Sequence, residues 1–591
     1  MNESRDGSSS ARLARERSRQ KKRWLVCQVD IPRASNLATA LNISPIIAGL
    51  LVTRGYAEAD AAKAFLTPAL DQLHDPFLML GMAEAVARLQ LAIDNSEPIL
   101  IYGDYDVDGT TGTAVLLRAL RMLGATVGYH VPHRFTEGYG IQQAGLERAL
   151  SEGFKLVVSV DCGITAHEPL NWARANGLDI IVTDHHLPDV DEGSPPALAV
   201  LNPNQHGCPY PDKNLAGVGV AFKLVQALFR ERGRETQVPG FLKMVALGTV
   251  ADVAKLVGEN RAIVTLGLSD LPRAVNHGLR ALIDIAGCGE GGAMTAYDLG
   301  FRIGPRINAA GRMDAARAVI ELFEAKDRDE ARRLADHLDL CNRERQEAQR
   351  EIFNRAIEEF ETGADRDSQT HAAVIAGDGW HRGVIGLAAS KIAERINRPC
   401  VVISLDGDLG HGSARSIEAY HLFDGLTSCR DLLEKFGGHS HAAGLSIRRD
   451  RIPEFRRRLN EHAASCLTDE DLTPMLKIDA EVAARELTFQ LSRDLSSLEP
   501  FGAGNPRPVF ATRDFRVLSE PQTIKNEHLK LRIAGEDNRP FEAIWWRGNE
   551  GLERAPRVKE RIELAYELES SLWNGEVRLQ LNVKDLRLVN G

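Results

Sequence analysis

The sequence predicts an α/β fold built on a parallel sheet, and three observations predict it. Compact apolar runs at Ile99–Tyr102, Leu156–Val160 and Asp179–Val182 are typical of strands that a sheet buries on both faces. Helical stretches such as Thr113–Leu123 separate the runs, so strand and helix alternate. A short polar motif directly follows each run, at the end where parallel sheets bind their ligands.

Metal-binding side chains fill these motifs and a fourth one further along the chain. They are Asp104, Asp106 and Asp108 in GDYDVDG, Asp161 in VDCG, Asp184, His185 and His186 in TDHH, and Asp252 in GTVAD. So many carboxylates in one crevice would repel each other unless divalent cations neutralised them. A mostly oxygen donor set favours Mn²⁺ or Mg²⁺, with Zn²⁺ as an alternative. Two ions bridged by a shared carboxylate are the usual device for attack of water on a phosphate ester, so we expect metal-dependent phosphoester hydrolysis.

Two simpler interpretations of the first motif compete with this one. Asp104, Asp106, Asp108 and Gly109 match the opening of an EF-hand calcium loop. That loop needs a glutamate at its twelfth position, where this chain has Val115, and a helix before it, where this chain has an expected strand. A solvated turn would also suit one acidic motif, but four motifs, each after an expected strand, favour a divided metal site.

Several longer motifs resemble one protein family. The four motifs above are similar to those of the DHH phosphoesterase superfamily, and GWHRGVIG from Gly379 and GGHSHAAG from Gly437 resemble its DHH-associated domain. IGPRINAAGRMDAA and LEPFGAGNPRPVF resemble the RecJ family of single-stranded-DNA-specific exonucleases. The resemblance runs from about Leu73 to the C-terminus. It implies a metal-dependent 5′-to-3′ exonuclease that hydrolyses single-stranded DNA to 5′-mononucleotides by two-metal-ion water attack, in DNA repair and recombination.

The resemblance also implies a ligand set. One ion would be held by Asp104, Asp106 and Asp161, and the second by Asp108, Asp161, His185 and Asp252. Asp161 would then be the bridging ligand. His186 would lie near the leaving group or the scissile phosphate, and orienting a metal ligand is an equal alternative for it.

Further residues are implied to contact DNA. Arg134, Tyr139, Arg306 and Arg312 match positions that line the DNA path, where arginines would clamp phosphates and Tyr139 would stack on a base. A structural salt bridge is the alternative for Arg306 and Arg312.

The segment HGSARS carries two more of these residues. Its backbone N–H groups and Ser413 suit an anion, with Arg415 as a bidentate phosphate partner, and the resemblance implies that it holds the 5′ phosphate. Ala414 stands where many relatives have glycine. His439, in GGHSHAAG, is assigned to the substrate cleft rather than to a metal.

Composition and charge bound the alternatives. At 591 residues the chain exceeds a single core, so we expect three or four domains. The net charge of −10 and the pI near 6.0 are not typical of a nucleic-acid-binding protein. Any contact with DNA must therefore come from local groups of basic residues. Scattered cysteines without a CxxC pair fit a reducing cytoplasm. The absence of a long apolar run predicts that nothing spans a membrane.

Six segments are expected along the chain. They are a disordered basic arm (1–24), a helical preface (25–75), a DHH metal-binding catalytic domain (76–292), an inter-lobe segment with a long connecting helix (293–364), a DHH-associated α/β domain (365–466) and an OB-like β-barrel (473–591). The long helix is expected from about Met313 to Gly363, with a coiled coil as its rival. In the barrel, Trp545, Trp546 and Trp573 are candidates for stacking on unpaired bases, with core packing as the alternative.

The expected partners are single-stranded DNA, a RecQ-type helicase and a single-stranded-DNA-binding protein, and the chain is expected to be a monomer. Two other functions compete. A small-molecule phosphoesterase would share the metal motifs but would not need the C-terminal β domain. A non-enzymatic helicase subunit of similar fold would be expected to have lost metal ligands, whereas this sequence has all of them.

Overall fold

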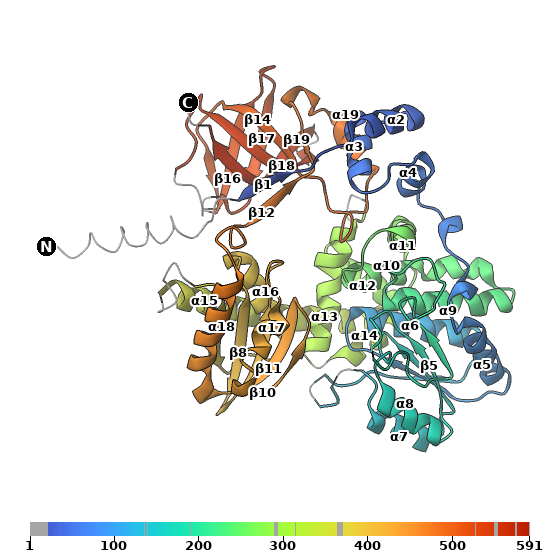
Figure 1. The fold of residues 1–591 in the computed structure, drawn as a ribbon. Helices are drawn as coiled ribbons and strands as arrows, with labels where there is room; N and C mark the ends of the chain where they lie inside the picture. Colours follow the sequence, from blue (N-terminus) through green and yellow to red (C-terminus); the bar gives the residue numbers. More distant parts are fainter. Residues whose placement is uncertain are drawn as a thin grey trace. The chain divides into compact units, whose positions relative to one another are not determined.

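The chain forms two compact units (Figure 1), each described here by itself. The computed structural model describes residues 22–134, 136–138, 140–189, 191–288, 293–313, 315–362, 370–525, 527–548, 554–573 and 576–589. The first unit comprises Glu58–Glu344 and Leu498–Arg507. The second unit comprises Met1–Ala57, Arg345–Ser497 and Pro508–Gly591.

A parallel sheet of five strands organises the first unit. Its order is β3-β2-β4-β5-β6, with bounds β2 (Ile99–Gly103), β3 (Val127–His130), β4 (Leu156–Val160), β5 (Asp179–Thr183) and β6 (Ala199–Leu201). The three predicted strands are confirmed, because β2, β4 and β5 lie where the apolar runs placed them. The chain leaves β2 for β3 on one side and then returns to β4 on the other. This reversal creates a topological switch point between β2 and β4, where open α/β sheets bind ligands.

Helices cover both faces of this sheet because successive strand residues point to opposite sides. Ile99 and Ile101 belong to one core, and Leu100 and Tyr102 to the other. The first core is completed mainly by α5 (Met82–Asp94), α6 (Val107–Met122), α9 (Gly217–Glu231) and α10 (Leu242–Ala251). The second is completed by α7 (Gln143–Ser151) and α8 (His167–Ala175). The predicted α/β class is therefore confirmed.

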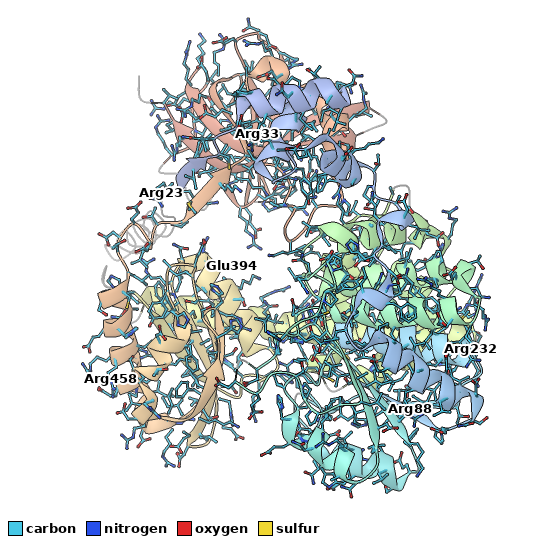
Figure 2. The ribbon with its side chains drawn as sticks, turned by 45° about the vertical axis from the view of Figure 1, so that its right-hand side comes forward. Arg23, Arg33, Arg88, Arg232, Glu394 and Arg458 are labelled. Carbon is cyan, nitrogen blue, oxygen red and sulfur yellow. The ribbon has the colours of Figure 1, made fainter. Side chains whose placement is uncertain are left out.

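Arg88 links α5 to the sheet (Figure 2). Its guanidinium donates to Asp179, the first residue of β5, at 2.6 Å and lies 2.8 Å from Glu97. The side chain of Arg88 is only 12% exposed, and its contact with Asp179 helps to fix the start of β5.

The remaining helices of the first unit follow the sheet or precede it. They are α4 (Ala59–Leu66), α11 (Gly258–Asp270), α12 (His277–Ile285), the π-helix η5 (Asp298–Ile303), α13 (Gly304–Arg312) and α14 (Ala316–Phe323), with short 3₁₀ turns at Leu70–Gln72, Pro76–Leu78, Glu235–Phe241 and Leu271–Arg273. The long helix, expected from Met313, begins only at Arg328: α15 (Arg328–Thr362) has 35 residues. The side chain of Asp327 accepts a hydrogen bond from the N–H of Glu330 at 2.8 Å. This bond caps the N-terminus of α15 and favours a helix that begins after Asp327.

A second sheet lies in the second unit. Its order is β10-β11-β9-β8-β7, with bounds β7 (Ala373–Asp378), β8 (Cys400–Asp406), β9 (Leu409–Arg415), β10 (Leu433–Gly438) and β11 (Ala442–Arg448). Only β7 and β8 are parallel. The accompanying helices are α16 (Ile385–Ile396), α17 (Leu422–Thr427) and α18 (Ile452–Cys466), with 3₁₀ turns at Arg430–Leu432 and Arg449–Arg451.

The C-terminal strands close into a barrel. They are β14 (Phe510–Val517), β15 (Gln522–Ile524), β16 (His528–Ala534), β17 (Pro540–Trp545), β18 (Arg561–Trp573) and β19 (Glu576–Leu588), preceded by β12 (Met475–Ile478), β13 (Ala480–Glu481), a 3₁₀ turn at Ala484–Glu486 and α19 (Phe489–Ser496). The order β14-β18-β19-β17-β16 is closed by pairing between β14 and β16. A closed barrel of this size is the OB-fold architecture expected for residues 473–591.

The N-terminal segment differs from a purely helical preface. Residues 1–21 of the expected basic arm lie outside the described residues, but Arg23 and Trp24 open the strand β1 (Arg23–Val26). This strand pairs in parallel with β12, and the Trp24 indole donates to Asp585 at 2.8 Å. These distant partners explain why the end of the arm is ordered. Helices α2 (Ile31–Leu41) and α3 (Pro45–Thr53) follow.

Among the described residues, no single helix has the length and apolar character that crossing a membrane requires. Two consecutive segments, Leu70–Leu78 and Met82–Asp94, reach that length and composition only when they are taken together, and the chain bends by 82° between them.

Candidate metal centre

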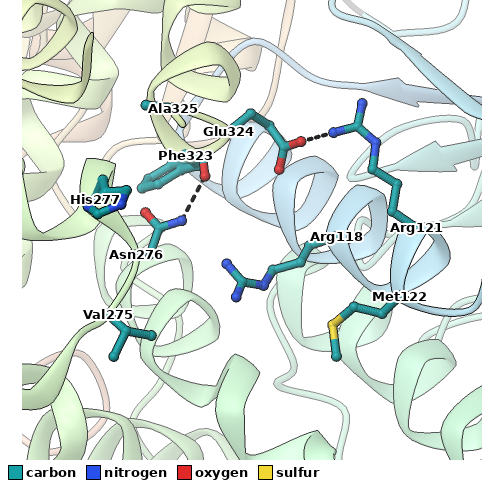
Figure 3. A pocket seen from close by; sticks show the side chains of 9 residues that line it. All are labelled: Arg118, Arg121, Met122, Val275, Asn276, His277, Phe323, Glu324 and Ala325. Atoms are coloured by element: carbon teal, nitrogen blue, oxygen red, sulfur yellow. Dashed lines mark hydrogen bonds and ion pairs between the residues drawn. The ribbon is translucent and has the colours of Figure 1, made fainter. Parts of the chain in front are cut away.

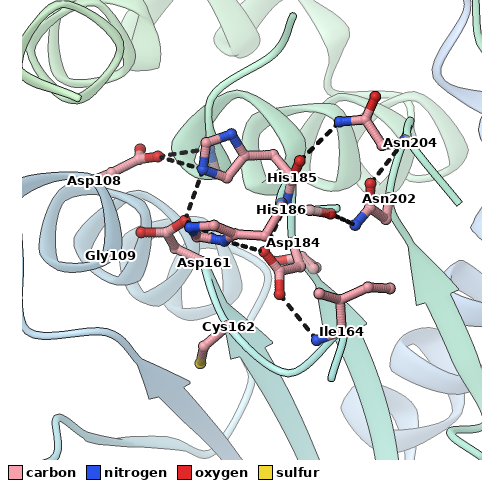
Figure 4. Close-up of polar contacts among 12 residues, drawn as sticks. Asp108, Gly109, Asp161, Cys162, Ile164, Asp184, His185, His186, Asn202 and Asn204 are labelled. Carbon is pink, nitrogen blue, oxygen red and sulfur yellow. Dashed lines mark hydrogen bonds and ion pairs between the residues drawn. The ribbon is translucent and has the colours of Figure 1, made fainter. Parts of the chain in front are cut away.

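The metal-binding motifs of the first unit meet at one edge of its sheet (Figure 4). Asp104 follows β2, Asp161 follows β4, and His185 comes from the turn after β5. The expectation that all four motifs follow strands is wrong for Asp252, which reaches the same place as the C-terminal capping residue of the helix α10. The structure therefore brings together side chains separated by almost 150 residues, at the switch point between β2 and β4.

The first turn of α6 presents two of the carboxylates. Asp106 caps the helix and accepts from the N–H of Gly109 at 3.0 Å. Asp108 is fully buried and accepts from the N–H groups of Gly217 and Val218 at 2.6 and 2.8 Å. These bonds are formed at the N-terminal ends of α6 and α9, where helices favour negative charge. They fix both carboxylates before any cation binds.

Asp161 has a left-handed backbone with φ of 63°. This conformation is uncommon for residues other than glycine and turns the side chain inward from the end of β4. Gly217 makes room for it, because a Cβ at that position would lie 2.5 Å from the Asp161 Oδ1. A side chain at 217 would therefore displace the carboxylate.

The imidazole of His185 lies among three carboxylates. Its Nε2 is 3.2 Å from Asp161 Oδ1, 3.8 Å from Asp108 Oδ2 and 4.0 Å from Asp252 Oδ2. Three groups have ligand atoms that all lie within 4.8 Å of one another: Asp104, Asp106 and Asp161; Asp108, His185 and Asp252; and Asp161, His185 and His186. Each of the six predicted ligands falls in at least one group.

Burial and mutual repulsion raise the pKa values of these carboxyl groups. Burial is the larger cause, and it raises the pKa of Asp104 to about 8 and that of Asp108 to about 7, with Asp106 adding to both. Burial and the charge of Asp108 raise the pKa of Asp252 to about 9 and hold the pKa of Asp161 well above its ordinary value. The protein therefore holds carboxyl groups that ionise reluctantly without a cation.

The donor atoms fit a divalent cation. Asp104 Oδ1, Asp161 Oδ1 and His185 Nε2 are buried and make no hydrogen bond among the described residues. Buried polar atoms of this kind normally have a partner, and a cation would provide one. Oxygen atoms dominate the set, and such sets are typical of Mn²⁺ and Mg²⁺ sites.

Asp184 has a role that the sequence did not assign. It is buried, and its Oδ1 lies 2.8 Å from His186 Nδ1 and accepts the backbone N–H groups of His185 and His186. Burial alone would raise the pKa of Asp184, but the His186 ring and the backbone N–H groups of Ile164 and His186 lower it below its usual range. The same bond outweighs burial at His186 and raises its pKa. The TDHH motif was the available signal, since carboxylates commonly orient neighbouring imidazoles.

Basic residues flank the centre in the first unit. The Arg134 guanidinium lies 5.0 Å from the centroid of Tyr105, between Asp104 and Asp106 in sequence, and Arg312 ends α13. Arg306 instead donates to Asp339 at 2.8 Å and is 17% exposed, which is the structural alternative foreseen for it. Tyr139 lies outside the described residues.

In the second unit, Ser413 and Arg415 lie together on β9. Arg415 donates to Ser413 Oγ at 3.1 Å and to the Ala414 carbonyl at 2.8 Å, and burial lowers the pKa of its guanidinium. A Cβ at Gly386, near the start of α16, would lie 3.0 Å from Ser413 Oγ, so the glycine keeps this space open. Because Arg415 pairs with Ala442, the exposed loop that carries His439 lies at the same end of the sheet.

The expected anion contacts through backbone N–H groups of HGSARS need correction. Residues 411–415 belong to β9, which pairs with β8 on one side and β11 on the other. The sheet therefore uses these N–H groups, and only the side chains of Ser413 and Arg415 remain as candidates.

A separate pocket of about 470 Å³ lies near the C-terminal end of α6 (Figure 3). Arg118, Arg121 and Glu324 are among its lining residues, and Arg121 forms an ion pair with Glu324. The metal centre lies at the other end of α6, a helix of 16 residues that spans roughly 24 Å. This pocket therefore contributes no ligand to the centre.

Three family models match the chain. They are the DHH family N-terminal domain over residues 98–249, the DHHA1 domain over 368–465 and the RecJ OB domain over 478–585. All of the expected metal ligands except Asp252 fall in the first match.

Whole-chain relatives agree with these matches. The chain is 39% identical to the single-stranded-DNA-specific exonuclease RecJ of Bacillus subtilis over 570 residues, covering 96% of this chain and 71% of that protein. It is 34% identical to the Escherichia coli protein of the same name, covering 92% and 96%. A crystal structure of Thermus thermophilus RecJ in complex with Mn²⁺ matches with a TM-score of 0.82 and 32% identity, covering 97% of this chain and 80% of that one. A Mg²⁺ complex from the same organism matches with a TM-score of 0.77.

Proposed function

We propose, from the premise that this chain belongs to the RecJ family of single-stranded-DNA-specific exonucleases, that it is a metal-dependent exonuclease acting on single-stranded DNA. The observation that carries the proposal is the convergence of Asp104, Asp161 and His185 at the carboxyl ends of three neighbouring strands. Each of these residues has a buried ligand atom that makes no hydrogen bond among the described residues, and such atoms suit a divalent cation. Bound Mn²⁺ or Mg²⁺ would polarise a phosphodiester and activate water.

We assign the ligands to two ions. Asp104, Asp106 and Asp161 would hold one, and Asp108, Asp161, His185 and Asp252 would hold the other. Two of the compact groups of donor atoms support this division. Asp161 would contribute to both sites, since it shares one compact group with Asp104 and Asp106 and another with His185.

The chain's own residues position the reaction. Gly217 and Val218 hold the Asp108 carboxylate through their N–H groups, so this ligand does not reorganise during turnover. Asp184 holds the His186 ring and favours its protonated form. In the proposed role, His186 donates a hydrogen bond to a non-bridging phosphate oxygen or to the departing sugar oxygen.

We also propose 5′-to-3′ cleavage that releases 5′-mononucleotides, which is the direction that the family resemblance implies. In this proposal Ser413, Arg415 and His439 contact the 5′ phosphate of the strand. The adjacent side chains of Ser413 and Arg415, and the open space at Gly386, support an anion contact. We assign Arg134, Tyr139, Arg306 and Arg312 to the DNA path, with Arg306 acting only after release from Asp339.

The proposed setting is DNA repair and recombination in the cytoplasm, where the chain acts as a monomer with a RecQ-type helicase and a single-stranded-DNA-binding protein. All eight cysteines are free, as in proteins of reducing compartments.

Side-by-side digestion tests the direction. Single strands labelled at the 5′ or the 3′ end are incubated with Mn²⁺, and early products are resolved. The 5′ label should appear at once as mononucleotide, while the 3′ label should remain on progressively shorter strands. Immediate release of the 3′ label would contradict the assigned direction, and internal fragments would contradict exonuclease action.

A further inference from the structure

Two aromatic side chains stand exposed in the first unit beside the metal centre. Tyr297 is 62% exposed and Phe301 is 71% exposed. Their rings are stacked, with centroids 4.8 Å apart and planes inclined by 23°. Two large rings exposed together form an apolar patch, and such a patch is typical of a surface that a ligand covers.

Local structure presents the two rings together. They are four residues apart on a helical segment, which brings their side chains to one face. Phe301 belongs to the π-helix η5, a rare element that is frequent at functional sites. Arg302 follows directly with a side chain about half exposed, paired with Asp298 at 3.2 Å. Arg302 also interacts electrostatically with Tyr297, so its guanidinium lies near the aromatic pair.

Glycines place this segment against the metal-binding residues. A Cβ at Gly300 would lie 3.4 Å from Val250, and one at Gly304 would lie 2.9 Å from the Cβ of Ala251, just before the ligand Asp252. At the far end of α13, Gly311 approaches the carbonyl of Tyr105, between Asp104 and Asp106 in sequence. The segment from η5 to α13 therefore runs along the centre, from the Asp252 side to the Tyr105 side.

Exposed apolar side chains recur at the rim of the centre. Leu187 directly follows His186 and is 78% exposed. Val253 directly follows Asp252, is 70% exposed and has a φ of 63°, which is unfavourable for a β-branched residue. Inorganic phosphate or pyrophosphate offers nothing apolar to such a rim. A nucleotide chain offers both phosphates for the cations and flat base faces for the rim.

We propose that Tyr297 and Phe301 form a stacking platform for unpaired bases of the strand whose phosphates enter the metal centre. The inference rests on the proposed function and adds a base-binding site to it. An unpaired base stacks on the outer face of the ring pair. Arg302 contacts a phosphate of the same strand. Every base has a flat face, so the platform binds without regard to sequence.

Replacing the rings while keeping apolar volume tests the platform. The double variant Tyr297→Leu/Phe301→Leu should raise KM on single strands about 10-fold or more, the usual effect of losing base stacking. Its kcat and its melting temperature should remain near wild type. The control Val275→Ser changes an apolar residue that is 82% exposed in the same unit and should leave KM unchanged.

A single abasic nucleotide, moved stepwise along the strand, distinguishes base stacking from other roles. Wild type should show a raised KM when the abasic nucleotide occupies one or two particular positions, and the double variant should show no such penalty. An equal penalty in both proteins, or an unchanged KM on intact strands, would overturn the proposal and favour a protein partner on this surface. If wild type does not cut single strands, the proposed function fails instead, and fluorescence anisotropy with the same strands and Mn²⁺ still tests the platform.

Discussion

Asp184 holds the ring of His186, with its Oδ1 2.8 Å from the imidazole Nδ1. The carboxylate is buried while the imidazole is half exposed, so the pair joins the interior of the sheet to the surface of the metal centre. Asp184 also accepts the N–H of Ile164 at 2.9 Å, which ties the turn after β4 to the turn after β5. The orientation of His186 is therefore built into the fold.

Substituting Asp184 should affect the rate more than binding. Asp184→Asn keeps the size of the side chain but removes the charge that orients His186. We expect kcat to fall about 10- to 100-fold, as is usual when a partner of a metal-site histidine is changed, with KM altered little. Steady-state kinetics on single strands measure both. A variant with wild-type kcat would show that the pair is not needed for turnover.

Cations should stabilise the first unit, because they neutralise buried carboxylates that repel one another. Mn²⁺ at about 100 times its dissociation constant should add about 2.7 kcal/mol of stability to the wild type. Asp161→Asn removes one repelling group, so without metal it should melt at or above the wild-type temperature and should respond less to Mn²⁺. Thermal melting in chelator and in Mn²⁺ gives both values. Identical wild-type melting in the two conditions would rule out a cation at this site.

Arg415 should discriminate between strand ends. A charged hydrogen bond contributes about 1.5–3 kcal/mol, so Arg415→Ala should slow cleavage of 5′-phosphorylated strands about 10- to 100-fold and affect 5′-hydroxyl strands less. Arg448→Ala, an exposed arginine on β11 of the same sheet, is the matched control. Equal slowing on both kinds of strand would make Arg415 a general backbone contact.

Two adjacent tryptophans of the barrel distinguish DNA binding from core stability. Trp546 is 57% exposed, with its ring 4.8 Å from that of His528, whereas Trp545 is 3% exposed. Trp546→Ala should raise KM about 10-fold on long strands and little on oligomers too short to reach the barrel. Trp545→Ala should instead cost about 3–5 kcal/mol of stability. The OB-type barrel would not be a DNA-binding surface at Trp546 if long and short strands responded alike.

Local patterns predicted the part of the site that lies at strand ends. Continuous apolar runs end where β2, β4 and β5 end, and the residues that follow must meet at one edge of a parallel sheet. The convergence of Asp104, Asp161 and His185 could therefore be foreseen. The barrel was expected at residues 473–591, but the lengths of its strands were not predicted: β18 and β19 each have 13 residues, and polar positions near their ends hide the alternation.

Contacts between distant residues could not be predicted. Arg306 pairs with Asp339 after a turn and a further helix, and nothing near either residue specifies that geometry. The pairing of β1 with β12 joins segments about 450 residues apart, and no local pattern fixes such a register. The same holds for β9, whose two neighbouring strands use the N–H groups that were expected to bind an anion. The side chain of Trp573 lies outside the described residues.

The most direct test of the metal centre is the single-turnover rate of Asp161→Ala on 5′-labelled single strands in saturating Mn²⁺, measured beside DNA binding by the same protein. Asp161 contributes to two groups of donor atoms, so its loss should cost several kcal/mol of barrier, about a 1000-fold loss of rate or more. DNA binding should stay within about 3-fold of wild type, since the aromatic and basic contacts remain. A folded Asp161→Ala protein that keeps more than about a tenth of the wild-type rate would contradict a hydrolytic centre at this edge of the sheet.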